Sequence, residues 1–306
     1  MQHTQGSIDM KPLQADCRTT RFAVYVLNGR RGLAVDLGEG FRGLFRDEPG
    51  YPGDLDHLVA NQAELVAATK ALNLGQPISI DAVQLLPPFP NPGKVICLGL
   101  NYVDHSAEVG IALPDYPTVF ARFASNLIGH GAPIPMPSQS TQLDYEGELV
   151  AVIGRGGRSI SRAKALDHVA GYSIFNDVSV RDYQLRTSQW TLGKNFDGTG
   201  AFGPFFVAAE ALPPGCRGLN LTTRLNGRIV QNAAITDMVF DVETLIVTLS
   251  DAFTLCAGDI IVTGTPGGIG MSHHPPLWMK PGDVCEVEIS RLGVLRNSIV
   301  APSARN

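Results

Sequence analysis

Two pairs of short, apolar-rich segments stand out along the chain, and an Asn-Gly dipeptide separates the members of each pair. The first pair covers residues 22–27 and 33–37, and the second covers residues 221–225 and 229–232. Short segments of this kind, bounded by turn residues, favour β-strands. Asn-Gly supplies the positive φ angles that a tight two-residue turn requires. The pattern therefore predicts two β-hairpins.

A helical spacing follows the first hairpin. Between residues 55 and 74 apolar positions recur every three or four residues, as in an amphipathic helix, and Asp54 is placed to cap its start. The proline-rich segment 87–93 then interrupts both helix and sheet. We therefore predict a small N-terminal α+β domain over 1–90 and a second domain over 91–306. Residues 1–20 are expected to form a disordered or loosely packed arm.

The second domain is predicted to be rich in β-structure. The chain contains 33 glycines and 21 prolines, which indicates many turns between short strands. One amphipathic helix is predicted over 242–255. The predicted fold class is mainly β with α/β elements. The strands are expected at 95–98, 144–153, 169–175, 259–263, 284–289 and 293–295.

Composition narrows the expected partners and location. The net charge of −5 gives no basic surface for nucleic acid or anionic membranes, so small molecules are the expected partners. Five cysteines without a C-x-x-C pair predict neither a disulfide framework nor a zinc knuckle. The chain has no long apolar run and residues 1–21 are polar, which predicts neither a membrane-spanning helix nor a signal peptide. These features predict a cytoplasmic protein.

The strongest candidate for chemistry is the segment Asp144-Tyr-Glu-Gly-Glu148. In one extended strand Asp144, Glu146 and Glu148 would project from the same face. A rise of roughly 3.3 Å per residue places the Cβ atoms of the two glutamates about 6 to 7 Å apart, so their carboxylates can converge on one cation. The apolar residues 149–153 lead this strand into a core, where unpaired carboxylates are costly and a divalent metal removes that cost. For an isolated pair of glutamates, a solvated edge strand is the commoner explanation.

His105 and Glu108 lie three residues apart in a helix predicted over 101–109 and ended by Gly110, so they would share one helix face. A carboxylate beside an imidazole fixes its tautomer and raises its basicity, which a water-activating base needs. The alternative is an incidental pair on a surface helix.

A second polar stripe begins at the end of the strand over 169–175. Asp177 is placed to cap a helix in which Asp177, Arg181 and Gln184 lie on one side. A carboxylate at the end of a strand is a common place for a ligand, and a solvated helix face is equally expected.

Two glycine-rich segments offer further candidates. Lys194 lies in the segment 193–200, where it could stabilise a developing oxyanion or be an ordinary loop lysine. The segment 259–270 runs from a buried strand into a turn whose amides and Thr265 hydroxyl could hold a substrate carboxylate.

Taken together, five segments resemble the fumarylacetoacetate hydrolase family. The resemblance covers roughly residues 90 to 300 in unbroken order, and a match in several parts is more specific than any one motif. The segments are GLNYVDHSAE (99–108), DYEGELVAVIG (144–154), NDVSVRDYQ (176–184), GKNFD (193–197) and VTGTPGGIG (262–270).

The resemblance implies a catalytic domain folded as a mixed β-sandwich roll, and a homodimer. It implies a Mg²⁺ or Mn²⁺ ion held by Glu146, Glu148 and Asp177, whose oxygen ligands suit such hard cations. It also implies that His105 and Glu108 form a catalytic dyad in a lid that orders over bound substrate.

The resemblance further assigns residues to the substrate. Lys194 matches a catalytic position, and Arg181, Gln184 and Thr265 match positions that contact the substrate or its oxyanion. The chain also departs from the family. Asn101 stands near the place of an additional metal-binding Asp of fumarylacetoacetases, and Arg122-Phe123 replaces the Lys-Pro of many relatives. Candidate contacts for the substrate tail are Tyr102, Tyr116, Phe120, Arg122 and Trp190.

The expected activity is hydrolysis of a carbon–carbon bond in 2,4-dioxo acids, of the acylpyruvate or fumarylpyruvate type, through a metal-stabilised enolate. Such a reaction would serve aromatic or sugar-acid catabolism. Two groups of enzymes share the enolate and stay open as alternatives. They are isomerases or decarboxylases of 2-hydroxyhepta-2,4-diene-1,7-dioate and 5-carboxymethyl-2-hydroxymuconate, and oxaloacetate decarboxylases. A non-catalytic protein that binds a small diacid is the alternative of another class.

Overall fold

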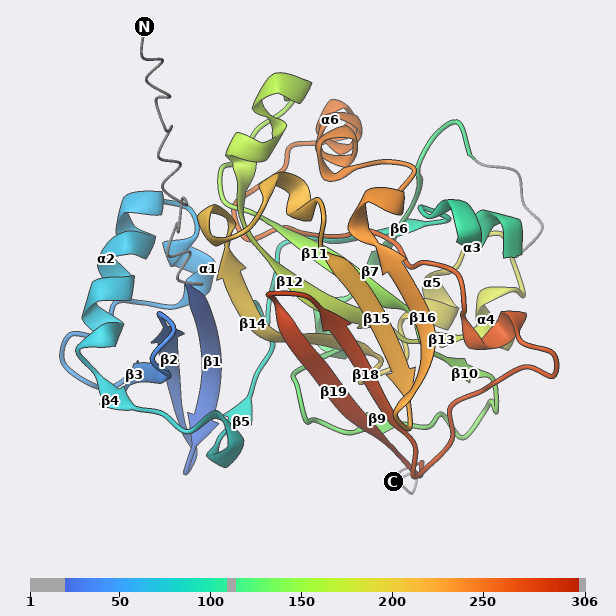
Figure 1. The fold of residues 1–306 in the computed structure, drawn as a ribbon, viewed down its shortest axis with the longest axis horizontal. Coiled ribbons are helices and arrows are strands. Elements are labelled where there is room, and N and C mark those ends of the chain that lie inside the picture. Colours follow the sequence, from blue (N-terminus) through green and yellow to red (C-terminus); the bar gives the residue numbers. More distant parts are fainter. Residues whose placement is uncertain (1–19, 109–113, 303–306) are drawn as a thin grey trace, which may run out of the picture.

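The computed structural model describes residues 20–108 and 114–302, with the backbone alone for residues 105–107. Within these ranges the strands form one long mixed sheet, a five-stranded sheet and a two-stranded pair. Figure 1 shows most of the five-stranded sheet, in orange and red, beside the long sheet, whose N-terminal strands, in blue, lie at one end. The mainly β fold class predicted from the sequence is confirmed.

The long sheet has 12 strands in the order β4-β3-β2-β1-β14-β12-β11-β17-β6-β7, with β5 paired to β1 and β8 paired to β14. The pairs β17–β6 and β14–β8 are parallel, and the other pairs are antiparallel. The strands are β1 (Arg21–Leu27), β2 (Arg30–Asp36), β3 (Phe41–Phe45), β4 (Gln76–Pro77), β5 (Gln84–Leu85), β6 (Val95–Gly99), β7 (Thr118–Arg122), β8 (Leu127–Ile128), β11 (Gly147–Ile153), β12 (Val169–Asp177), β14 (Gly200–Ala208) and β17 (Ile260–Val262).

The second sheet and the helices complete the fold. The five-stranded sheet has the order β16-β15-β18-β19-β9, and β10 pairs with β13. These strands are β9 (Ile134–Pro135), β10 (Leu143–Asp144), β13 (Ser179–Val180), β15 (Asn220–Leu225), β16 (Arg228–Ala234), β18 (Val284–Ile289) and β19 (Gly293–Val300). The helices are α1 (Leu55–Leu58), α2 (Gln62–Asn73), α3 (Val103–Glu108), α4 (Arg181–Gln184), α5 (Thr191–Lys194) and α6 (Val242–Ala252).

Strand β11 is buried on both faces, as its apolar sequence predicts. Leu149, Ala151 and Ile153 point into a core that they share with the five-stranded sheet and α6. Val150 and Val152 point the other way, into a core that they share with β1 and α2. Because successive side chains alternate, this one strand joins both cores and fixes the position of the residues that precede it.

Both predicted hairpins are confirmed, as β1–β2 and β15–β16. The turn residues have the left-handed conformation that the Asn-Gly pattern requires. Their φ angles are 52° and 78° at Asn28 and Gly29, and 52° and 79° at Asn226 and Gly227.

The single helix predicted over 55–74 is wrong, because the chain forms two helices, α1 and α2. Asp54 precedes α1, but its side chain makes no capping hydrogen bond and instead accepts one from the Tyr51 hydroxyl at 2.7 Å. Asn61 caps α2 by accepting a hydrogen bond from Ala63 N at 3.0 Å. A side chain that bonds its own backbone in this way competes with continued helix, which explains the break.

The N-terminal strands continue the long sheet. Strand β1 pairs with β14, where Arg21 lies opposite Val207 and Phe22 opposite Phe206. The division into domains at residue 90 therefore stays a prediction. No helix in the described ranges is both long and apolar enough to cross a bilayer.

Candidate active site at the end of the long sheet

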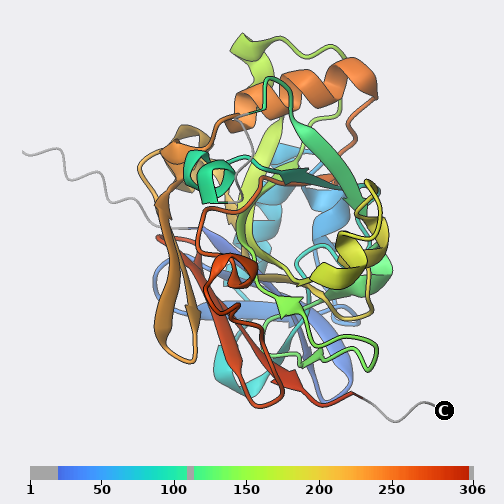
Figure 2. The same cartoon turned by 90° about the vertical axis from the view of Figure 1, so that its right-hand side faces the viewer.

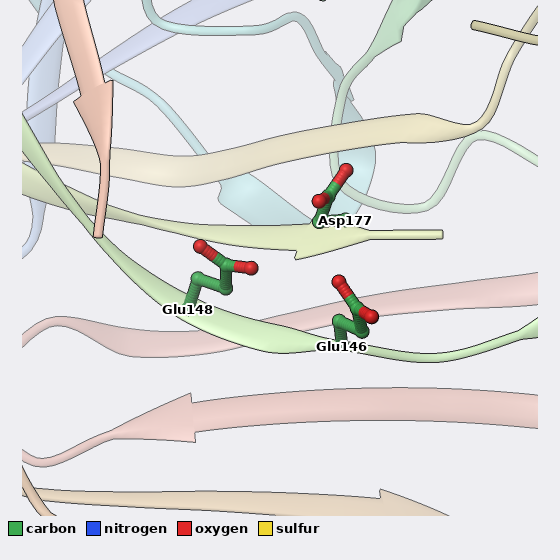
Figure 3. Close-up of side chains that lie close together, drawn as sticks. All are labelled: Glu146, Glu148 and Asp177. Carbon is green, nitrogen blue, oxygen red and sulfur yellow. The ribbon is translucent and has the colours of Figure 1, made fainter. Parts of the chain in front are cut away.

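Three acidic side chains meet where β11 and β12 lie side by side. Glu148 belongs to β11, Asp177 is the last residue of β12, and Glu146 directly precedes β11. Asp177 N donates a hydrogen bond to Glu146 O at 2.8 Å, which fixes the two residues opposite each other. All three are buried, and one carboxylate oxygen of each lies within 4.8 Å of the others. Figure 3 shows the three carboxylates gathered above the two strands.

The strand that carries the acids differs from its prediction. It is interrupted at Tyr145 and Glu146, between β10 and β11, so the expectation of one continuous strand is wrong. Asp144 accepts hydrogen bonds from Gly270 N at 2.7 Å and from Met271 N at 3.0 Å. It is a structural acid beside the group, and Glu146 and Glu148 alone converge from this segment.

The helix predicted to begin at Asp177 is also different. Asp177 ends β12 and does not cap a helix, since α4 starts at Arg181 with Val180 at its N-cap. The intervening residues pair with β10 instead. Arg181 and Gln184 remain on one short helix, and Arg181 NH1 donates to Gln184 Oε1 at 2.8 Å.

Three buried cations face the acids. Lys194 Nζ lies 2.5 Å from Glu146 Oε2 and 2.7 Å from Asp177 Oδ2. Arg181 NH2 lies 2.6 Å from Glu146 Oε1. Arg122 NH1 forms an ion pair with Asp177 Oδ1.

The group contains more acids than cations, and this imbalance opposes full ionisation of the acids. Burial, followed by the nearby charges of Asp177 and Glu146, raises the pKa of Glu148 well above its ordinary value. Burial lowers the pKa of Lys194, but the neighbouring carboxylates outweigh it and raise the pKa overall. The four buried acids, with Asp144 included, exceed the three cations. An all-oxygen donor set with this excess suits a hard divalent cation, so Glu146, Glu148 and Asp177 could hold a divalent metal.

A pocket opens onto this group. It encloses about 530 Å³ of free space including its mouth. Its charged lining residues are Glu146, Glu148, Arg181 and Lys194. Its apolar lining includes Phe120 and Trp190, whose ring centroids are 5.5 Å apart in an edge-to-face contact, and Lys194 Nζ lies 5.0 Å from the centre of the Phe120 ring.

The structure places most of the predicted substrate residues at this pocket. Arg181, Gln184 and Thr265 line it. The Thr265 hydroxyl donates to Gly147 O at 2.9 Å and accepts from Gln231 Nε2 at 2.8 Å. Its only proton is therefore engaged, and the hydroxyl has the capacity to act as an acceptor toward a ligand.

The candidates for the substrate tail divide into two groups. Phe120 and Trp190 line the pocket, whereas Tyr102 is 1% exposed and is not among its lining residues. Tyr116 is 66% exposed, and Arg122 is buried against Asp177. The role predicted for Tyr102 stays a prediction, without support from the lining of the pocket.

Helix α3 begins at Val103 rather than at residue 101. Its Glu108 Oε2 accepts a hydrogen bond from Gly268 N at 2.8 Å, and Ile269 next along the chain lines the pocket. Helix α3 is thereby held beside the pocket. Figure 2 shows α3, in teal, at the end of the molecule that faces the viewer, apart from α4 and α5, in yellow, at the same end. The His105 side chain and Gly110 lie outside the described residues, so the predicted dyad stays a prediction.

Asn101 has a structural role in this fold. Its amide nitrogen donates to Thr263 O at 2.7 Å and to Phe240 O at 3.0 Å, and its amide oxygen accepts from Phe240 N at 2.8 Å. These bonds tie the start of α3 to β17 and to the segment before α6. The residue that stands near the additional Asp of fumarylacetoacetases is therefore fully engaged with backbone groups.

The sequence analysis did not predict two contacts at the site. Gln231 Oε1 accepts from Gly147 N at 3.0 Å, so a residue of the second hairpin holds the backbone between the two glutamates. The ion pair of Arg122 with Asp177 was also missed. Neither contact leaves a local signal, because the partners are 84 and 55 residues apart along the chain.

Comparison with known proteins supports the same family. Residues 94–300 match the family model described as fumarylacetoacetate (FAA) hydrolase C-terminal. The chain is 37% identical over 290 residues to the mitochondrial oxaloacetate tautomerase FAHD2A of Homo sapiens, covering 93% of this chain and 92% of that protein. It is 39% identical over 279 residues to the oxaloacetate tautomerase YisK of Bacillus subtilis (strain 168), covering 87% of this chain and 92% of that protein.

Solved structures of related proteins support the same family. The fumarylacetoacetate hydrolase of Exiguobacterium antarcticum superposes with a TM-score of 0.78 at 33% identity, covering 92% of this chain and 99% of that one. The 5-carboxymethyl-2-hydroxymuconate delta-isomerase of Mycobacterium smegmatis superposes with a TM-score of 0.73 at 27% identity, covering 93% of this chain and 100% of that one. The segments that suggested the resemblance lie around one pocket in a matching fold. The chain belongs to the fumarylacetoacetate hydrolase family.

Proposed function

We propose that this protein is a divalent-metal-dependent tautomerase, which interconverts the keto and enol forms of a small 2-oxo dicarboxylic acid such as oxaloacetate. The observation that carries the proposal is the convergence of Glu146, Glu148 and Asp177 beside a pocket that also presents Lys194. Similarity over nearly the whole chain to proteins named oxaloacetate tautomerases supports this substrate class. These relatives favour the enolate alternatives over carbon–carbon hydrolysis, which was our first expectation.

Glu146, Glu148 and Asp177 would hold Mg²⁺ or Mn²⁺, which supplies Lewis acidity toward the carboxylate and 2-oxo oxygens of a 2-oxo acid. The other catalytic roles belong to side chains of the protein. Lys194 brings a positive charge to the side of the pocket where the 2-oxo oxygen gains negative charge as the enolate forms. Because Lys194 is 2% exposed, water screens this charge little.

Arg181 orders the polar wall of the pocket. It binds Asp144 through Nε at 2.8 Å and Gln184 through NH1 at 2.8 Å. The Gln184 oxygen is therefore turned toward Arg181, and its amide nitrogen is the group left to donate to a substrate carboxylate. Thr265 offers an acceptor on the neighbouring wall.

Tautomerisation moves one proton between C3 and the 2-oxo oxygen. We assign the exchange at C3 to His105, with Glu108 as the carboxylate that orients it. The hydrogen bond from Gly268 N holds Glu108 next to the pocket, which suits this role. The apolar lining with Phe120 and Trp190 limits the access of water, which would otherwise compete as a proton donor.

Hydrolysis of an acylpyruvate is the second candidate. The apolar lining of the pocket favours it, because an acyl tail would pack against Phe120 and Trp190. Hydrolysis needs an attacking water that His105 would activate, whereas tautomerisation and decarboxylation do not. The homodimer, the cytoplasmic location and the metabolic setting stay predictions.

The decisive experiment follows the decay of freshly dissolved enol-oxaloacetate by its ultraviolet absorbance. We expect acceleration above the buffer rate with Mg²⁺ or Mn²⁺, loss of the acceleration in chelator, and no pyruvate by nuclear magnetic resonance. Glu148→Gln should abolish the acceleration, whereas the same change at Glu288, which pairs with Arg224 on the surface at 2.6 Å, should leave it unchanged. Pyruvate formation would assign decarboxylation instead, and cleavage of acylpyruvates without any effect on the enol would assign hydrolysis.

A further inference from the structure

The Asp177 carboxylate is held by two buried cations, one on each oxygen. Arg122 NH1 donates to Oδ1, and Lys194 Nζ lies 2.7 Å from Oδ2. The side chains of both cations are at most 2% exposed. Two positive charges are more than one carboxylate needs for neutralisation. Arg122 and Lys194 could therefore have different roles.

Arg122 is anchored through both terminal nitrogens of its guanidinium group. Its NH2 donates to Thr199 Oγ1 at 2.7 Å, and its NH1 also donates to Val178 O at 3.3 Å. Its guanidinium carbon lies 5.5 Å from the centre of the Phe175 ring. Arg122 is not among the residues that line the pocket. A planar guanidinium bound at several points has a fixed orientation, so Arg122 fixes the plane of the Asp177 carboxylate from behind.

Lys194 is placed differently. It ends α5 and lines the pocket. Its ammonium bridges Glu146 Oε2 and Asp177 Oδ2, two of the three acids that could hold a metal. An ammonium on a four-carbon stem is a mobile point charge. Lys194 therefore occupies the space between the carboxylates that a divalent cation would need.

We propose that the two cations act in opposite ways on a divalent metal. Arg122 is a positioning residue, which occupies Oδ1 and leaves Oδ2 directed toward Glu146 and Glu148. Lys194 is a resident counter-cation, which neutralises the acids when no metal is bound and is displaced into the pocket when the metal arrives. Displacement would bring its charge to the substrate only in the metal-loaded protein. This inference rests on the metal site of the proposed function.

Two matched substitutions separate the roles. Arg122→Met and Lys194→Met each remove one buried positive charge and keep an unbranched stem. Charge alone predicts that both changes tighten metal binding, because both remove a cation near the site. The proposal predicts opposite signs. Lys194→Met should tighten binding by at least about tenfold, and Arg122→Met should weaken it by about 10- to 100-fold, as expected for loss of a residue that orients a ligand.

The measurement is the dissociation constant for Mn²⁺, obtained by titration calorimetry on metal-free protein without substrate. Changes of the same sign, or no change in either variant, would overturn the proposal. The thermal midpoint in chelator reports folding separately. If Arg122→Met does not fold, Arg122→Lys and Thr199→Val take its place. Lysine keeps the charge but lacks the planar guanidinium that holds Asp177 and Thr199 in one fixed geometry, and valine removes only the anchor at Thr199.

Both replacement variants should weaken Mn²⁺ binding, and unchanged affinity in both would refute the role of Arg122. Because no substrate is present, the test is independent of the catalysed reaction. If the two variants shift the Mn²⁺ dissociation constant in opposite directions but the protein does not act on enol-oxaloacetate, this inference stands and the proposed function is rejected. If the protein is a tautomerase but both variants shift the dissociation constant in the same direction, the proposed function stands and this inference is rejected.

Discussion

Replacing Asp144 by asparagine tests how strongly the buried acids hold the site together. Asp144 is fully buried and accepts four hydrogen bonds. Its Oδ1 accepts from Tyr145 N at 2.8 Å and Gly270 N at 2.7 Å. Its Oδ2 accepts from Met271 N at 3.0 Å and Arg181 Nε at 2.8 Å. One carboxylate thus joins β10, the turn that lines the pocket and helix α4.

Asparagine has a single acceptor oxygen, so either orientation of the amide turns an NH₂ group toward two of the four donors. Each lost bond to a charged group costs about 1.5 to 3 kcal/mol, or about 3 to 6 kcal/mol for two. Breaking a buried ion pair by removing one partner costs about 3 to 5 kcal/mol, which agrees. We therefore expect Asp144→Asn to lower the free energy of unfolding by about 3 to 5 kcal/mol, a large share of the roughly 5 to 15 kcal/mol of a typical protein.

Urea denaturation of the metal-free protein measures this loss, with the slope of the transition as a check on two-state behaviour. Asp47→Asn is the matched control, because Asp47 pairs with Arg30 at 2.7 Å while its side chain is 66% exposed. An exposed pair is worth less than about 1 kcal/mol. A loss below about 1 kcal/mol for Asp144→Asn, equal to that of the control, would refute the view that this carboxylate organises the site.

Two further substitutions probe packing and capping. Gly99→Ala would place a Cβ atom 2.3 Å from Trp190 Cζ3, so we expect a destabilisation of about 1 to 3 kcal/mol and a raised KM as the indole shifts; an unchanged melting temperature would contradict this contact. Asp241 caps α6 by accepting from Thr244 N at 2.9 Å, so Asp241→Ala should cost about 1 kcal/mol. Although burial raises the pKa of Asp241, its hydrogen bonds to Thr244 and Arg162 outweigh burial and lower the pKa to about 2. Its contribution should therefore be complete above the unfolded pKa of about 3.9 and be lost as the pH falls toward 2. A difference in unfolding free energy between wild type and Asp241→Asn that stays constant from pH 6 to 2 would disprove this linkage.

Local features of the fold were predictable where a short segment carries its own physical reason. The hairpin at Asn226-Gly227 depends on positive φ angles that these residues adopt readily, and the structure has them. The break between α1 and α2 was not predicted, because the apolar spacing continues through Asn61. The decisive interaction there is one side-chain hydrogen bond to Ala63 N, which a periodicity analysis does not detect.

The candidate site shows the same division. The spacing of Glu146 and Glu148 suggested two converging carboxylates, and the structure brings them together with Asp177. The local pattern left Asp177 open between a ligand and a solvated residue, and the resemblance to the family named it as the third acid. The sequence also placed Asp144 in one row with the two glutamates, and the structure shows that Asp144 pairs with Arg181, which Glu146 contacts as well.

The sequence by itself determined the turns, the doubly buried strand β11 and the residue types that suit a hard cation. These follow from backbone preferences and from apolar patterns within a few residues. Only the tertiary structure decided which charges face each other. Asp177 meets Glu146 because β12 lies beside β11, and Arg122 and Lys194 reach Asp177 from β7 and α5. The strength of such pairs depends on separation and on exclusion of water, and both are set by the register of distant strands rather than by neighbours along the chain.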